Sequence, residues 1–337
     1  MNPRLLFLLL LFPLSGFATP KPDKDKDVKI FKAYEDSLVK IGPAVFRGTN
    51  DQKFAANKKF SDLLYKAINT PGAFDYPFDS LKFIGNLIAP DKAFRIFNWN
   101  IPKDDGTYMY YGYIVVDESK VLDKKAQKSQ YVIYELEDKS NEIRNPELSV
   151  LSPEKWFGAL YYQIILKEDK DHKKFYTLLG WDGNNSMTWK KILDAITFGR
   201  DGKPIFGEKQ IFQRNKKRTS NRVIFEFRGE LTMALHWDDK ENAIVFDHLA
   251  PEVSGAEGMY QFYSSDGSYD AFIWKKGKWT LSEDYKAENP TTPQDKNYNQ
   301  PQGDQNPSGQ NQGTSGDQAQ HKKKKLFKRK PVPVQHQ

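Results

Sequence analysis

Hydrophobic residues recur at every third or fourth position up to residue 90, which is the spacing of amphipathic helices. The pattern predicts three helices: one that ends at Gly42, one that ends at Pro71 and one that begins at Ser80. We therefore expect residues 19–90 to form a helical N-terminal subdomain. The residues expected to face its core are Phe31, Tyr34, Leu38, Ile41, Phe60, Leu64, Ile68, Leu81, Ile84 and Ile88.

From residue 91 to residue 286 the pattern changes to short apolar runs, separated by turn sequences such as Asp266-Gly267. Short strands joined by tight turns predict an antiparallel β-meander, closed as a barrel or packed as a sandwich. The expected fold class is α+β, mainly β, with a helical N-terminal part and one helix inserted among the strands. The predicted strands cover residues 93–101, 108–116, 131–137, 157–167, 174–181, 222–228, 231–237, 243–249, 259–263, 269–275 and 278–281.

The inserted helix is predicted within residues 176–199, where a strand leads into the turn Asp182-Gly183-Asn184-Asn185. Apolar residues after the turn stand at i, i+3, i+4 and i+7, the spacing of one helical face, and Gly199 is a typical helix stop. The residues of that face are Trp189, Ile192, Leu193 and Ile196.

A β-hairpin is predicted over residues 231–249. A loop at residues 238–241 would place Trp237 opposite Asn242 and Leu235 opposite Ile244, with the larger apolar side chains on one face. In this register His236 and His248 lie on opposite faces, so they do not share a metal ion.

The first 18 residues have the pattern of a signal peptide, with Arg4, an apolar run over residues 5–14 and a small-residue cleavage site before Thr19. An uncleaved anchor is the alternative, but the run is shorter than the ~20 residues that span a membrane. We expect an exported protein, periplasmic or secreted, with no transmembrane helix in the mature chain.

Residues 287–337 are rich in Pro, Gln, Asn, Gly and Ser, which predicts a disordered linker followed by a basic tail. Eight Lys or Arg and four Asp or Glu give this segment +4 of the chain's formal charge of +7, whereas residues 19–286 hold +2. We therefore expect no specific nucleic-acid binding by the body. The tail would bind a polyanion, namely anionic lipid, lipopolysaccharide or polysaccharide; a solubilising tail, or one removed by proteolysis, is the alternative. Its cations are Lys322, Lys323, Lys324, Lys325, Lys328, Arg329 and Lys330.

The first candidate binding residues of the body surround the turn after Trp181. Asp182 and Asn184 offer oxygen atoms at alternate positions, but Met187 and Leu193 stand where a calcium loop needs Gly and Glu. A plain turn is therefore expected, and no metal. Trp181 either stacks on a sugar or packs in the core.

Glu226 and His248 are the other candidates. Burial of Glu226 in its aromatic strand would raise its pKa and suit it to general acid catalysis, and an ion pair with Arg228 or a lysine is the alternative. His248 is expected to face inward, with Asp247 on the opposite face, and a hydrogen-bonded core histidine is the alternative. The chain has no cysteine and lacks the short motifs of metalloproteases, serine hydrolases and nucleotide-binding loops. We assign no catalytic residue and expect no cofactor.

Four segments, at residues 75–81, 94–100, 156–162 and 176–184, resemble a group of exported proteins of Bacteroidetes-type bacteria. The likeness covers roughly residues 28–250 and not the tail. It implies export from a bacterium with two membranes. Since no activity is assigned to that group, the resemblance carries no functional residue over to this chain.

The leading hypothesis is an exported cell-envelope binding or structural protein without enzymatic activity, whose basic tail contacts a polyanion. The alternative is a secreted hydrolase or carbohydrate-binding enzyme that uses carboxylates near Trp181, such as Asp182 and Glu226. Hydrolysis of a glycoside needs two carboxyl groups roughly 5–10 Å apart, so the spatial arrangement of the carboxylates decides between these hypotheses.

Overall fold

A computed structural model describes residues 24–122, 129–207 and 210–286. The predicted signal peptide, the linker and the basic tail lie outside the described residues. The helices are α1 (Lys24–Ile41), α2 (Asn50–Ile68) and the single turn α3 (Glu118–Val121), with short 3₁₀ segments at Gly42–Phe46, Ser140–Glu142, Pro153–Lys155 and Tyr260–Phe262.

The strands form three sheets, here called sheets 1, 2 and 3. Sheet 1 has the order β1 (Gly85–Ile88), β2 (Phe94–Pro102), β3 (Tyr108–Asp117) and β4 (Tyr131–Glu137). Sheet 2 has the order β11 (Val223–Arg228), β7 (Thr188–Phe198), β6 (Lys174–Asp182) and β5 (Leu160–Glu168), with β8 (Pro204–Phe206) beside β7. Sheet 3 has the order β10 (Thr219–Ser220), β9 (Phe212–Gln213), β15 (Lys278–Ser282), β14 (Tyr263–Lys275), β13 (Ala243–Pro251) and β12 (Leu235–Asp238).

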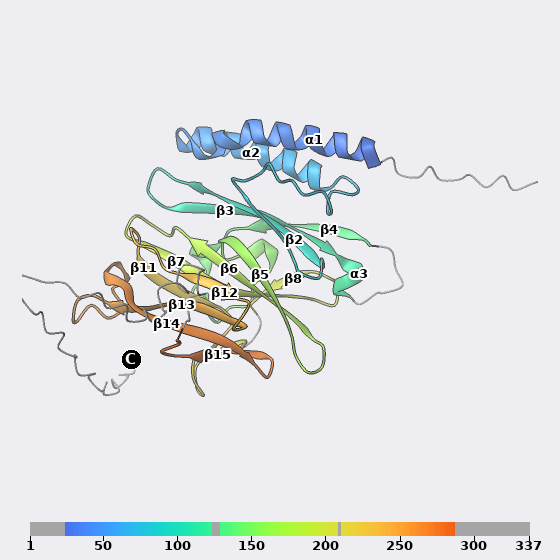
Figure 1. The fold of residues 1–337 in the computed structure, drawn as a ribbon. Helices are drawn as coiled ribbons and strands as arrows, with labels where there is room; N and C mark the ends of the chain where they lie inside the picture. Colours follow the sequence, from blue (N-terminus) through green and yellow to red (C-terminus); the bar gives the residue numbers. More distant parts are fainter. Residues whose placement is uncertain (1–23, 123–128, 208–209, 287–337) are drawn as a thin grey trace, which may run out of the picture. The chain divides into compact units, whose positions relative to one another are not determined.

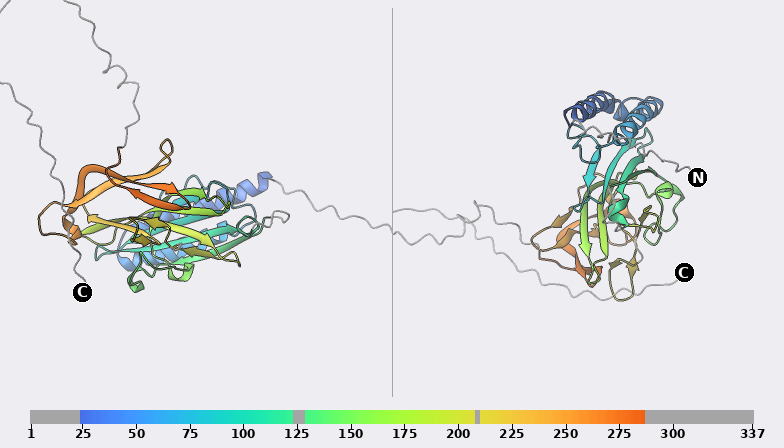
Figure 2. Two further views of the ribbon diagram at one scale, coloured as in Figure 1. Left: turned by 90° about the horizontal axis from the view of Figure 1, so that it is seen from below. Right: turned by 90° about the vertical axis from the view of Figure 1, so that its right-hand side faces the viewer.

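The helices and the three sheets are stacked as four layers (Figures 1 and 2). A first hydrophobic cluster joins α1 and α2 to one face of sheet 1, and it includes Phe60 and Trp99. A second cluster lies between sheets 1 and 2, and a third lies between sheets 2 and 3. Sheet 2 is therefore apolar on both faces.

The expected fold class is confirmed: the chain is mainly β, and an N-terminal helical segment precedes antiparallel sheets. None of the three sheets closes into a barrel. Among the strand pairs within the described ranges, β9 with β15 is parallel and the others are antiparallel. No helix in the described part of the chain is both long and apolar enough to cross a membrane.

The predicted inserted helix is wrong, because residues 188–198 form strand β7. Along β7, Ile192 and Ile196 face the cluster between sheets 1 and 2, whereas Leu193 and Ala195 face the cluster between sheets 2 and 3. A strand buried on both faces is apolar at consecutive positions. Some of its apolar residues therefore also match the i, i+3, i+4, i+7 spacing of a helix by coincidence. The hairpin pairing of β6 with β7, with Tyr176 opposite Ile196, replaces the expected strand–turn–helix.

The third predicted helix is also wrong, since turns cover residues 79–83 and β1 follows. Leu81 and Ile84 are buried as expected, but Ile88 is 41% exposed, so the three do not share one buried face. The segment is instead bound to sheet 1, where β1 pairs with β2.

The predicted hairpin of residues 231–249 exists with its register shifted by two residues. Leu235 lies opposite Phe246 and Trp237 lies opposite Ile244. A shift of two preserves the faces of the strands, so Leu235, Ile244 and Phe246 all point into the cluster between sheets 2 and 3. The hydrophobic pattern alone cannot distinguish registers that differ by two.

Candidate functional site

A polar cavity of about 440 Å³, here called the Asp182 pocket, lies where the start of β3 meets the turn between β6 and β7. Its lining includes the two tyrosines at the start of β3, the segment after β4 and the end of β6. The lining residues include Tyr108, Tyr110, Asp138, Asp182, Asn184 and Lys190.

Asp182 is a buried carboxylate, only 6% exposed, at the end of β6. Its Oδ1 accepts hydrogen bonds from the Tyr110 hydroxyl at 2.8 Å and from the backbone N–H of Asn184 at 2.7 Å. Its Oδ2 lies 3.8 Å from Lys190 Nζ. Burial raises the pKa of Asp182 above its ordinary value, although the positive charge of Lys190 acts in the opposite direction.

A second carboxylate, Asp138, lines the same pocket and is held in place by three donors. The backbone N–H and the hydroxyl of Ser140 donate to Oδ1, at 3.0 and 2.6 Å, and the backbone N–H of Tyr110 donates to Oδ2 at 3.0 Å. Gly158 permits this position, because a Cβ there would lie 2.6 Å from the carboxylate. The negative charge of Asp138 contributes to the raised pKa of Asp182.

A hydrogen-bond network links the pocket to β11. Lys190 Nζ donates to Asn184 Oδ1 at 2.7 Å, and Asn184 Nδ2 donates to Thr188 Oγ1 at 2.7 Å and to Glu226 Oε1 at 3.2 Å. The Thr188 hydroxyl also donates to Glu226 Oε1 at 2.7 Å. Three of the residues singled out from the sequence, Asp182, Asn184 and Glu226, are thus brought together. Arg228, one of the ion-pair partners expected for Glu226, pairs with Glu252 instead.

Trp181 does not line the Asp182 pocket, but its ring packs against that of Tyr108, which does. The Tyr108 and Trp181 rings meet edge to face with centroids 5.4 Å apart, and Trp181 meets Trp189 in the same way at 5.8 Å. The ring of Tyr108 rests against Gly183, where any Cβ would overlap it. Glycine at this position therefore lets an aromatic ring cover the end of β6 beside Asp182.

His248 lies on β13, in sheet 3, and does not line the Asp182 pocket. Its Nδ1 is 2.8 Å from Asp270 Oδ2 on the neighbouring strand β14. Asp247 is engaged elsewhere, since its Oδ2 accepts from the backbone N–H of Ala234. The pairing of β13 with β14 shifts between residues 247 and 249. Strict alternation of side chains along the strand therefore does not predict the face on which His248 lies.

The sequence reasoning missed Tyr110, Asp138 and Lys190. Asp138 had a local signal, because an aspartate two residues before a serine is typical of a side-chain-stabilised turn. Tyr110 had none: it reaches Asp182 only because sheet 1 packs on sheet 2, across 72 positions of sequence. Lys190 lies in the segment that the spacing predicts as a helix and that forms strand β7.

Replacement of Lys190 by methionine is expected to raise the pKa of Asp182 further, because the opposing charge is removed while burial remains. A carboxyl whose folded pKa exceeds its unfolded value stabilises the fold most at low pH, and this contribution is lost as pH rises through the folded pKa. The variant should therefore lose more stability than the wild type between acidic and neutral pH. An NMR titration of the Asp182 carboxyl carbon measures the shift.

The matched control is Lys191→Met, since Lys191 is the next residue of β7 and its ammonium group lies over the ring of Tyr162. This variant should leave the pKa of Asp182 unchanged. An equal shift in both variants would show that the effect is not a contact between Lys190 and Asp182.

In the described ranges no group of three His, Asp or Glu side chains is arranged to hold a metal ion. Comparisons of the chain with known protein families, with curated proteins and with solved structures give no match. Function is therefore inferred from the residues and the geometry of this chain alone.

Proposed function

We propose that the protein is an exported binding protein whose Asp182 pocket takes a neutral polyhydroxylated ligand, such as a sugar unit of a glycan. The observation that carries this proposal is the buried carboxylate of Asp182. Its Oδ1 is saturated by Tyr110 and Asn184, while Oδ2 makes no hydrogen bond within the described residues. Oδ2 belongs to a residue that lines the pocket and lies 3.8 Å from Lys190 Nζ, so it can still accept a hydrogen bond from a ligand that supplies a donor.

The rest of the pocket has the mixture of groups that hydroxyl recognition needs. Asp182 and Asp138 accept hydrogen bonds, and the ammonium group of Lys190 donates them. The half-buried ring of Tyr108 offers a flat apolar surface to the carbon face of a sugar ring. Each group is held in place by protein contacts, so little side-chain conformational entropy is lost when a ligand binds.

Binding is tested by titrating the full chain with a panel of neutral mono- and oligosaccharides, followed by calorimetry. Asp182→Asn keeps the shape of the side chain but can place an N–H₂ donor where the Oδ2 acceptor stood. We expect it to weaken binding about tenfold or more, as for a lost hydrogen bond to a charged group. Asp238→Asn, at the last residue of β12, is the control and should bind as the wild type. Absence of binding across the panel, or equal binding by Asp182→Asn, would reject the proposal.

A second candidate function is glycoside hydrolysis in the same pocket. It is favoured by the raised pKa of Asp182, which suits a general acid, beside the fixed carboxylate of Asp138. An enzyme of this kind would release reducing sugar from the bound glycan, with a pH profile whose basic limb follows the pKa of Asp182. Release that is abolished in both Asp182→Asn and Asp138→Asn supports it. A glycan that binds and is recovered intact counts against it.

The basic tail predicted from the sequence completes the proposed role. Seven cations within residues 321–330 would hold the protein on a polyanion such as anionic lipid, lipopolysaccharide or acidic polysaccharide. Deletion of residues 321–337 is expected to abolish binding to anionic vesicles and to lipopolysaccharide, measured by co-sedimentation. In the full chain the binding should fall steeply as salt is added, because the contact is electrostatic. Unchanged binding after the deletion would refute the tail assignment and leave the pocket proposal intact.

A further inference from the structure

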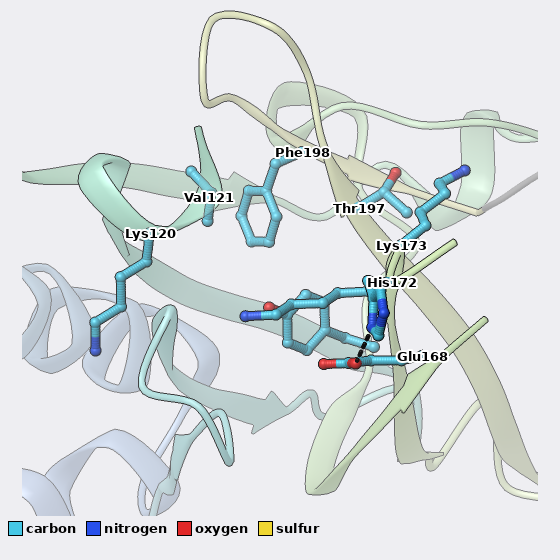
Figure 3. Close-up of a pocket in the computed structure, with 9 residues that line it drawn as sticks. Lys120, Val121, Glu168, His172, Lys173, Thr197 and Phe198 are labelled. Carbon is cyan, nitrogen blue, oxygen red and sulfur yellow. Dashed lines mark ion pairs between the residues drawn. The ribbon is translucent and has the colours of Figure 1, made fainter. Parts of the chain in front are cut away.

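A second and larger cavity, of about 570 Å³, is here called the Lys174 pocket. It is bounded by α3, by the turn between β5 and β6 and by the end of β7. Figure 3 shows Val121 and Phe198 on one side of the hollow, Lys120 at one end, and Glu168 with His172 at the other. No residue of the Asp182 pocket takes part in its lining.

The apolar part of the lining is aromatic. The rings of Tyr176 and Phe198 are nearly perpendicular, with centroids 6.0 Å apart, and Phe94 packs against both from the core. The Tyr176 hydroxyl donates to Asp91 Oδ2 at 2.8 Å, which fixes the ring. The cavity therefore has a rigid aromatic wall.

The charges around this wall are mainly positive. Lys174 Nζ donates to Asp91 Oδ2 at 2.7 Å, and the side chain is 42% exposed. An ammonium group has three donors, so two of those of Lys174 remain for a ligand. Lys120 Nζ lies 3.2 and 3.1 Å from the carbonyl oxygens of Asp91 and Lys92, and no carboxylate of the described residues pairs with it. Glu168, the carboxylate in the lining, lies 3.7 Å from His172.

Both ammonium groups contact the same residue, Asp91, one at its carboxylate and one at its carbonyl oxygen. Within the described residues, the carboxylate of Asp91 is the one that contacts either of these ammonium groups. A group with several negatively charged oxygen atoms can take hydrogen bonds from both lysines at once.

We propose that the Lys174 pocket binds a small aromatic phosphate monoester, with the phosphate on Lys120 and Lys174 and the ring against Phe198 and Tyr176. The volume suits a ligand of this size, since pockets for small molecules hold about 300–1,000 Å³. The site shares no lining residue with the Asp182 pocket, so tests of this proposal do not depend on the glycan proposal.

Calorimetric titration of the full chain with phenyl phosphate tests the proposal. The double variant Lys120→Gln/Lys174→Gln is expected to weaken binding about tenfold or more, because two charge-assisted contacts are lost. Phe198→Ala should weaken phenyl phosphate but leave inorganic phosphate unaffected. Lys59→Gln, a change of the same kind on the exposed side of α2, should bind as the wild type.

Three outcomes would overturn the proposal. Equal binding by the double variant would show that the two lysines hold no phosphate. An equal loss in Lys59→Gln would show that the protein's overall charge attracts the probe. Benzoate binding as tightly as phenyl phosphate would make the site a general organic-anion site and reject its assignment to phosphates.

Discussion

Replacing Arg222 with methionine is expected to lower the free energy of unfolding by about 3–5 kcal/mol, the usual cost of breaking a buried ion pair. Arg222 and Asp194 are both fully buried, with Nη2 and Oδ1 2.9 Å apart. Asp194 Oδ2 also accepts from the Tyr161 hydroxyl at 3.0 Å. The variant would leave the charge of Asp194 inside the protein without its cation.

The loss should depend on pH in a defined direction. Burial already raises the pKa of Asp194, and Arg222 opposes that effect. Without Arg222 the folded pKa rises further above the unfolded value. The variant should therefore be least unstable in acid, where Asp194 is protonated, and should lose stability as pH rises through the new folded pKa.

Urea unfolding of the variants at acidic and neutral pH measures both effects. Arg222 Nε makes no hydrogen bond and Nη1 donates to a single carbonyl, that of Pro146. The pair itself is thus imperfectly compensated, and Asp194→Leu/Arg222→Met should recover most of the loss. Arg200→Met, at an exposed turn, should change stability by less than about 0.5 kcal/mol. A double variant as unstable as the single one would contradict this account.

Much of the fold could be predicted from the sequence, because helical spacing and strand alternation act locally. The first two helices and most strands of sheets 1 and 3 lie where the pattern placed them. Prediction failed where tertiary packing overrides the local signal. Strand β7 is the clearest case, since its burial on both faces is a property of the stacked sheets and not of its own sequence.

The candidate site was predictable only in part. The turn at Asp182 and Asn184 is visible in the sequence because its residue types are turn formers. Tyr110 belongs to another sheet, and its approach to Asp182 depends on how sheets 1 and 2 are stacked. The orientation of His248 toward Asp270 depends on a strand irregularity, which alternation cannot reveal.

The second large effect is expected at Arg95, which is fully buried on β2 and binds the segment that leads from the helices into sheet 1. Its Nη1 donates to the carbonyl oxygens of Phe74 and Tyr76, at 2.9 and 2.6 Å, and its Nη2 donates to that of Pro77 at 2.7 Å. Nε and Nη2 also donate to Asn86 Oδ1. One guanidinium group thus replaces the regular backbone pairing that this segment lacks.

Arg95→Met should lower the free energy of unfolding by about 3–5 kcal/mol, because several buried carbonyl groups lose their donor at once. Arg95→Lys keeps the charge but has fewer donors and no planar fork, so it should recover only part of the loss. Arg47→Met, at an exposed position after the first helix, is the control. Urea unfolding measures these changes, and limited proteolysis locates them.

The site of cleavage separates a local role of Arg95 from a general one. If the guanidinium holds residues 73–77, the methionine variant should be cut first in that segment, at denaturant concentrations where sheets 2 and 3 remain protected. The cation also lies 4.5 Å from the centre of the Phe97 ring, in the cluster shared by the helices and sheet 1. Loss of Arg95 should therefore loosen the helical layer before the stacked sheets. Simultaneous cleavage throughout the chain would show that all four layers unfold as one unit.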